Sequence, residues 1–228
     1  MVKKRLISFG DSWAQGSELL PKEKTFGELL SEQLGCIEFS NYAVPASSIN
    51  HLIIQLKSHL HRLLAMGLDP SDWMAIFFLT DHNRGATAHN GQWIFQNAAG
   101  GFGELAVDRQ LVDQVNTAYW KYIHSPELST LTANSTILAL QRICQTHGID
   151  DYYVAGWQTL DLWPEVDVDK FYQGGKVSCG RLIGMQSDIP SSYVNRQNLN
   201  QSPGGHPNQL GHQIIADSLY KWITDCAR

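Results

Sequence analysis

The sequence LISFGDSW, residues 6–13, carries the strongest indication of the fold. Residues 6–9 form a short apolar run, which is typical of a buried β-strand, and Gly10 ends it. Gly10 allows close approach of the backbone, and Asp11 can fix the following turn through hydrogen bonds to nearby backbone groups. Ser12 therefore follows a predicted strand directly, where a tight turn can present its hydroxyl group to a cleft.

Short apolar strands alternate with amphipathic helices along the rest of the chain. Thr25 and Glu28 have the spacing of a capping box, which predicts a helix over residues 25–34. Ser48 precedes a longer amphipathic helix that ends at Gly67. The other predicted elements are strands at 37–39, 74–79 and 152–155 and helices at 107–124, 130–147 and 207–223. This order predicts an α/β fold in which helices cover both faces of a parallel sheet.

The whole chain, residues 1–228, is predicted to be one domain, because it shows neither internal repeats nor a linker. Two segments fit the alternation poorly and are expected to be long irregular insertions, near 84–103 and 158–201. Loops of that length in a compact domain are usually functional. In an open α/β sheet they gather beyond the carboxyl ends of the strands, where binding sites lie.

Composition excludes several classes of protein. The chain has 43% hydrophobic residues and a formal net charge of -5, which predicts a folded core and no nucleic-acid partner. No apolar run is long enough to span a membrane, and we expect a cytoplasmic location. The four cysteines are scattered, so neither a metal site nor a disulfide framework is expected.

Three polar segments follow predicted strands or open predicted helices. Ser12 is the candidate nucleophile, and residues 41–48 place backbone N–H groups near a helix start, which suits an oxyanion. His206 immediately precedes Pro207, the first residue of the last predicted helix, and is therefore fixed where a nucleophile needs its base.

These segments, FGDSW at 9–13, NYAVPASS at 41–48 and GGHPNQLGH at 204–212, together resemble the SGNH (GDSL-type) hydrolase family. The resemblance implies a flavodoxin-like three-layer α/β/α sandwich with a mostly parallel central sheet, and hydrolysis of ester bonds without a cofactor. It also implies that Ser12 attacks the acyl carbonyl, that His206 acts as general base, and that the Ser12 N–H belongs to the oxyanion hole.

The chain departs from the family pattern in its second and third blocks. Ala46 stands where the family has a glycine that donates its N–H to the oxyanion hole, and a methyl group is tolerable there if φ is negative. The family's third block supplies an asparagine donor. Strict spacing puts His82 at that position, whereas residue chemistry favours Asn83, and we assign the donor to Asn83, with Ala46 kept as a backbone donor. Arg84 follows and is a candidate contact for an anionic substrate or a partner in a salt bridge.

The last departure concerns the acid that orients the histidine. In the family it lies three residues before the histidine, and here that position is Pro203. A backbone carbonyl, a water molecule or another carboxylate such as Asp188 must then orient His206, so the prediction is a Ser–His dyad or an atypical triad.

The predicted function is hydrolysis of a small-molecule or glycan ester, as a carboxylesterase or a carbohydrate O-deacetylase. Two alternatives use the same site: a weak or inactive member that binds a glycan or acylated ligand, and an acyltransferase. The acyl group, the alcohol and the oligomeric state stay open.

Overall fold

The computed structural model describes residues 4–96, 102–103, 108–184, 200–202 and 205–226. Its central sheet consists of β1 (Arg5–Phe9), β2 (Phe39–Asn41), β3 (Trp73–Leu79) and β7 (Asp150–Ala155). These strands pair in parallel in the order β2-β1-β3-β7. In a flavodoxin-like fold the first strands of the sheet have this same order, and the binding crevice lies at the point where the strand order reverses. The carboxyl ends of β1 and β3 flank that point here.

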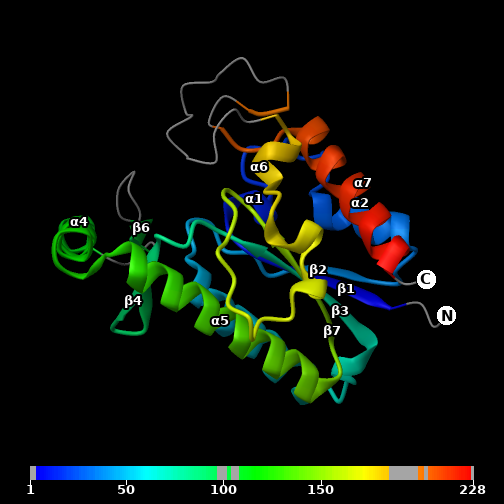
Figure 1. The fold of residues 1–228 in the computed structure, drawn as a ribbon, viewed down its shortest axis with the longest axis horizontal. Helices are drawn as coiled ribbons and strands as arrows, with labels where there is room; N and C mark the ends of the chain where they lie inside the picture. Colours follow the sequence, from blue (N-terminus) through cyan, green and yellow to red (C-terminus); the bar gives the residue numbers. More distant parts are fainter. Residues whose placement is uncertain (1–3, 97–101, 104–107, 185–199, 203–204, 227–228) are drawn as a thin grey trace.

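Helices pack on both faces of the sheet. The helices are α1 (Ser12–Gln15), α2 (Phe26–Leu34), α3 (Leu52–Ala65), α4 (Arg109–Ala118), α5 (Pro126–His147), α6 (Cys179–Leu182) and α7 (Gln209–Cys226). Shorter helical turns are η1 (Ile49–His51), η2 (Pro70–Asp72), η3 (Tyr119–Ile123), η4 (Val168–Lys170) and η5 (Tyr172–Gly175). Helices α3 and α5 share one hydrophobic cluster with the sheet, and α2 and α7 share the other. Figure 1 shows α5 on one side of the sheet and α2 and α7 on the other. The predicted three-layer α/β/α sandwich with a central parallel sheet is therefore confirmed.

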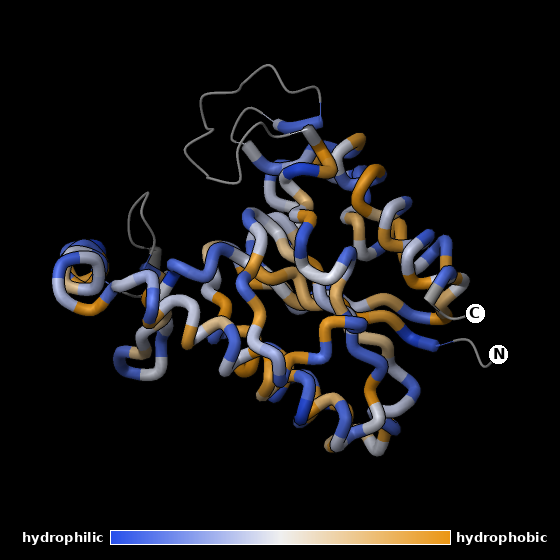
Figure 2. Tube along the Cα trace, in the orientation of Figure 1, coloured by the Kyte–Doolittle hydropathy of each residue, from blue (hydrophilic) through white to orange (hydrophobic). Residues whose placement is uncertain are grey.

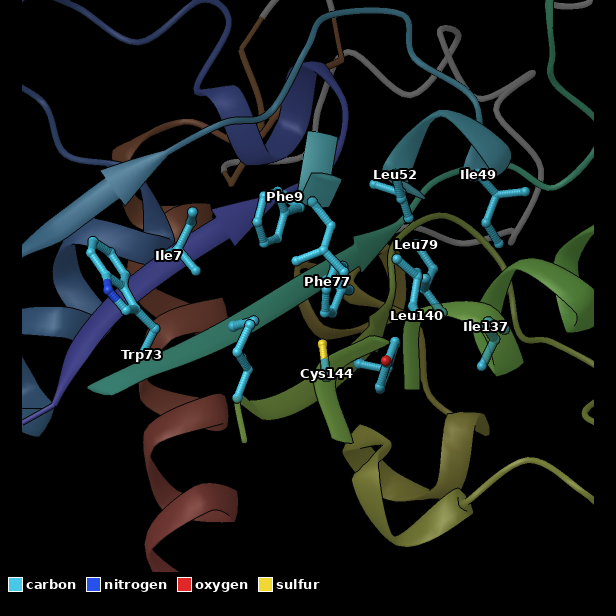
Figure 3. Packing of buried hydrophobic residues seen from close by; sticks show 14 of the residues in the cluster. Ile7, Phe9, Ile49, Leu52, Trp73, Phe77, Leu79, Ile137, Leu140 and Cys144 are labelled. Atoms are coloured by element: carbon cyan, nitrogen blue, oxygen red, sulfur yellow. The ribbon is translucent and has the colours of Figure 1, made fainter. Parts of the chain in front are cut away.

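The two faces of the sheet follow the alternation of side chains along its strands. On β3, Phe77 and Leu79 face the cluster under α3 and α5, which Figure 3 shows together with Phe9 of β1. Ile76 and Phe78 face the opposite cluster, under α2 and α7. Figure 2 shows hydrophobic stretches recurring along the central strands and hydrophilic stretches interrupting the covering helices.

Local sequence signals place α2 accurately. Thr25 and Glu28 form both halves of the capping box, and Gly35 ends the helix in the left-handed region with φ 67. The predicted strand at 37–39 is displaced, because pairing with β1 begins only at Phe39, opposite Leu6. Ile37, which precedes the pairing, is exposed.

The segment 84–103 is not irregular throughout, so this part of the prediction needs correction. It contains β4 (Gly85–His89) and β5 (Gln92–Gln96), which form an antiparallel hairpin, followed by β6 (Phe102–Gly103). Asn90 and Gly91 form the turn, both with positive φ, as a tight hairpin requires. This small sheet and α4 lie to one side of the central sheet (Figure 1). The described part of 158–201 has only the short elements η4, η5 and α6.

None of the helices in the described ranges combines the length and apolarity needed to cross a membrane.

Candidate active site

Ser12 and His206 meet at the carboxyl edge of the sheet. Ser12 is the first residue of α1, which starts directly after β1, and His206 lies just ahead of α7. The two residues are 194 positions apart in the sequence, yet His206 Nε2 lies 3.0 Å from Ser12 Oγ. This is the hydrogen-bond distance that a nucleophile and its general base require.

Asp11, the residue before the serine, holds the nucleophile turn inside the protein. Its side chain is 0% exposed, and Oδ1 accepts from the Trp13 N–H at 3.0 Å. Oδ2 accepts from Thr80 Oγ1 at 2.6 Å and from Arg84 Nη1 and Trp157 Nε1, each at 3.0 Å. A buried carboxylate is tolerated only when it is paired and hydrogen-bonded in this way. Asp11 therefore joins the chain segments that follow β1, β3 and β7.

Arg84 is engaged inside the protein. Its side chain is 10% exposed, donates to Asp11 and to Thr80 Oγ1, and lies over the Trp157 ring at 5.3 Å. It also lines, with His82, a cavity of about 170 Å³ near η3. The structure thus shows a buried ion pair at Arg84, and its guanidinium is the counter-charge of Asp11.

The second sequence block is attached to the nucleophile turn through Gly10. The Gly10 carbonyl accepts from Val44 N at 2.9 Å and from Ser47 Oγ and Gln55 Nε2, each at 3.0 Å. Gln55 Oε1 in turn accepts from Gly10 N at 3.0 Å. A side chain at Gly10 does not fit, because its Cβ would lie 2.7 Å from the Ala14 Cβ. The bonds fix the position of the 44–47 turn relative to Ser12.

Ala46 lies on this turn with φ 62, in the left-handed region. The sequence-based condition for an alanine there, a negative φ, is therefore not met. The cause is the geometry of the turn: Ser47 N donates to the Val44 carbonyl at 3.1 Å, so the chain reverses direction across Ala46. Among the described residues, neither the Ser12 amide nor the Ala46 amide donates to an acceptor, so both amides are available to a ligand.

Asn83, the donor favoured by residue chemistry, has both ends of its side-chain amide engaged. Nδ2 donates to Asp81 Oδ1 at 2.9 Å, and Oδ1 lies 3.1 Å from His124 Nε2. The Asn83 carbonyl also accepts from the Tyr119 hydroxyl at 3.0 Å. These contacts tie Asn83 to the segment around η3.

His82, the donor favoured by strict spacing, has a defined tautomer. Gln158 Nε2 lies 2.8 Å from His82 Nδ1 and also donates to Asp81 Oδ1 at 2.9 Å. An amide NH₂ group only donates, so Nδ1 accepts and the neutral ring carries its proton on Nε2. Burial lowers the pKa of His82, although Asp81 opposes this shift, and the ring is accordingly neutral near pH 7. His82 is thus a neutral N–H donor.

The other nitrogen of the catalytic imidazole faces a carboxylate that the sequence did not reveal. His206 Nδ1 lies 3.3 Å from Glu18 Oε2, within ion-pair distance but without the alignment of a hydrogen bond. Pro203 and Asp188, the positions considered from the sequence, lie outside the described residues. The available signal was proximity along the chain, because Glu18 is the first acid after Ser12 and follows the helix end at Gly16.

The backbone near His206 is held by short-range contacts. The His206 carbonyl accepts from Ser202 N at 2.8 Å, and Gln201 and Pro207 form an isolated β-bridge. Within the described ranges, no group of three or more His, Cys, Asp or Glu side chains could hold a metal ion.

No family model matches this chain, and no curated protein matches it. Solved structures similar to it include the psychrotrophic esterase EstA from Pseudoalteromonas sp., 11% identical over 97% of each chain with a TM-score of 0.49. The acetyl xylan esterase AlAXEase is 14% identical over 95% of this chain and 98% of its own, with a TM-score of 0.47. The lipase Lip_vut3 from a goat rumen metagenome is 16% identical over 96% and 97%, with a TM-score of 0.44. Similarity at these identities and TM-scores does not indicate the activity of this chain.

Proposed function

We propose that this protein is a serine hydrolase of the SGNH type that cleaves ester bonds, as a carboxylesterase or carbohydrate O-deacetylase. The observation that carries the proposal is the 3.0 Å contact between Ser12 Oγ and His206 Nε2 at the switch point of the sheet. A serine hydroxyl is a weak nucleophile, and an adjacent imidazole base is what activates it.

In the proposed reaction, His206 Nε2 takes the proton from Ser12 Oγ as the oxygen attacks the acyl carbonyl carbon. The tetrahedral intermediate collapses when the C–O bond to the alcohol breaks and His206 returns the proton to the departing oxygen. Water then attacks the acyl-serine with His206 again as base. The carboxylic acid leaves and the serine is restored. The scheme uses side chains, backbone amides and water, and no step needs a cofactor.

Three groups are proposed to form the oxyanion hole: the amides of Ser12 and Ala46 and the Nε2–H of His82. The two amides have no acceptor among the described residues, and Gln158 fixes the histidine tautomer in which Nε2 donates. We prefer His82 to Asn83 because the Asn83 amide is bonded to Asp81 and lies against His124. Removing one such donor typically costs about 3 kcal/mol of transition-state stabilisation.

Labelling with a fluorophosphonate probe tests the proposal, with hydrolysis of p-nitrophenyl acetate measured in parallel. The wild-type protein should be labelled, and both Ser12→Ala and His206→Ala should abolish labelling and turnover. Ser17→Ala is the matched control, because Ser17 follows the nucleophile helix directly and its hydroxyl donates to Gln15, its one side-chain bond among the described residues. This variant should retain the wild-type rate.

The possible outcomes separate the alternatives. If the folded wild-type protein shows no labelling that depends on Ser12, the hydrolase proposal is wrong and a ligand-binding role gains support. Faster release of p-nitrophenol when an alcohol acceptor is added, with an acylated acceptor as product, would identify an acyltransferase.

A further inference from the structure

We infer that Glu18 is the carboxylate that orients His206, so that the site operates as Ser12–His206–Glu18. The inference rests on the proposed function, since it assigns a positioning residue to the same site. It names an acid outside the block that carries the histidine, on the loop just after the nucleophile helix.

The two ring nitrogens of His206 divide the contacts between them. Nε2 lies 3.0 Å from Ser12 Oγ, and Nδ1 lies 3.3 Å from Glu18 Oε2. The histidine and glutamate side chains are 20% and 36% exposed, so the pair is only partly screened by water. His206 Nδ1 is itself buried and makes no hydrogen bond to any described residue. A buried N–H without an acceptor is costly, and the Glu18 carboxylate is the group in position to accept from it.

The loop that carries Glu18 is folded so that it returns to the nucleophile. Gly16 ends α1 in the left-handed region with φ 88, and Ser17 N donates to the Ser12 carbonyl at 2.9 Å. Leu19 N then donates to the Gly16 carbonyl at 3.1 Å. Within this turn Glu18 itself has φ 71, a conformation that residues other than glycine rarely adopt. Backbone strain of this kind persists where surrounding contacts enforce it, and it clusters at functional sites.

His212 is a second titratable group whose charge interacts with His206. It lies on α7, is fully buried, and its Nδ1 accepts from Phe26 N at 3.1 Å. Burial, reinforced by the nearby His206, lowers the pKa of His212 to about 4. His212 is therefore neutral at the pH of an esterase assay and does not repel a protonated His206.

With its proton on Nδ1 directed at Glu18, His206 presents an unprotonated Nε2 to Ser12. When His206 takes the serine proton, the carboxylate stabilises the resulting imidazolium. The 3.3 Å contact is longer than a formed charge-assisted hydrogen bond, and contacts of this type tighten when the substrate is bound.

The test compares Glu18→Gln, Glu18→Asp and Glu18→Gly in the full chain, using p-nitrophenyl acetate over a range of pH together with thermal unfolding. Glu18→Gln should lower kcat about 100-fold with little change in KM, and the acidic limb of its pH–rate profile should move to lower pH. Glu18→Asp should recover part of the rate. Glu18→Gly should lose as much rate as Glu18→Gln without a lower Tm, because glycine accepts the positive φ.

Glu23→Gln is the matched control, on the same loop. Glu23 Oε2 accepts from Leu20 N at 2.7 Å, a bond that an amide oxygen can replace, so this variant should keep the wild-type rate and pH profile. Asp188→Asn tests the competing acid. Either a wild-type rate in Glu18→Gln or a large loss confined to Asp188→Asn overturns the inference. A drop in rate that merely parallels a drop in Tm in Glu18→Gly also overturns it.

A measurement that does not depend on turnover separates this inference from the proposed function. In ¹⁵N-labelled protein, the Nδ1–H proton of His206, assigned with His206→Gln, should resonate further downfield in the wild type than in Glu18→Gln, because a carboxylate 3.3 Å away deshields this proton more than an amide does. An unchanged resonance refutes the role of Glu18. The absence of Ser12-dependent labelling refutes the hydrolase, whatever the resonance shows.

Discussion

The segment that carries Ser12 and the segment that carries His206 are built in different ways. Ser12 follows a strand inside the sheet, next to the buried Asp11 carboxylate, which accepts four hydrogen bonds. His206 lies ahead of α7 on a turn held by backbone bonds to residues 200–202, and its Nδ1 faces a partly exposed glutamate. The nucleophile is thus fixed by the core, and the base is placed by contacts near the surface.

This difference indicates which property each segment controls. Substitutions around the nucleophile should lower both the stability of the fold and the reaction rate, because the hydrogen bonds of Asp11 join the segments that follow β1, β3 and β7. Changes around the base should affect mainly the rate, because in the described residues this turn is held by backbone bonds, which side-chain substitutions leave in place. The variants of Glu18 probe the base, and substitutions at Arg84, His59 and Ala46 probe the surroundings of the nucleophile.

The largest expected effect follows from removing the counter-charge of Asp11. Arg84→Met should lower the free energy of unfolding by about 3 kcal/mol or more, because it leaves a buried carboxylate without its charged partner. Urea denaturation at pH 7.5 measures the loss. Arg142→Met is the control, since Arg142 is exposed and its guanidinium bonds to Gln145 alone among the described residues, and it should cost less than about 0.5 kcal/mol. Similar losses in the two variants would show that the ion pair between Arg84 and Asp11 does not stabilise the fold.

A smaller effect is expected at His59, which packs against Phe9 beneath the nucleophile. His59 is 2% exposed, neither ring nitrogen has a partner among the described residues, and burial, with a smaller contribution from Arg62, lowers its pKa to about 4. Between pH 6.5 and 4 the unfolded chain takes up this proton and the folded chain does not. The folded state therefore has its full stability with respect to His59 above pH 6.5, and its free energy of unfolding falls as the pH decreases towards 4.

His59→Phe should remove both the unpartnered polar group and its sensitivity to acid. We expect the variant to exceed the wild type in unfolding free energy by about 1 kcal/mol at pH 7.5 and by about 2 kcal/mol at pH 5.5. Urea denaturation at the two pH values measures both gains. A gain that is the same at both pH values would mean that His59 titrates normally in the folded protein.

The smallest expected effect concerns Ala46, the strained residue on the nucleophile side. Ala46→Gly should raise the unfolding free energy by about 0.5 kcal/mol, because relief of the left-handed conformation exceeds the entropy that glycine adds to the unfolded chain. Ala139→Gly, in the middle of α5, should instead lower it by about 1 kcal/mol. Losses of equal size in both variants would contradict the strain at Ala46.

Much of the fold could be predicted because its signals are local. The capping box at Thr25, the apolar run of β3 and the glycine-ended strand before Ser12 each act over a few neighbouring residues. The hairpin at 84–96 also had a local signal, the Asn90–Gly91 pair, but the surrounding Gly- and Asn-rich composition favoured an irregular prediction. Composition is a weaker guide there than the turn residues.

The sequence by itself determined the alternation of strands and helices, the strand end that presents Ser12, and the helix start that follows His206. Each of these depends on the hydrophobic period and capping of a single segment. The tertiary structure alone decided which carboxylate faces His206, what Arg84 pairs with, and which sign φ takes at Ala46. Those properties depend on contacts between segments far apart in the chain, and only the packing of the sheet and its connections brings such segments together.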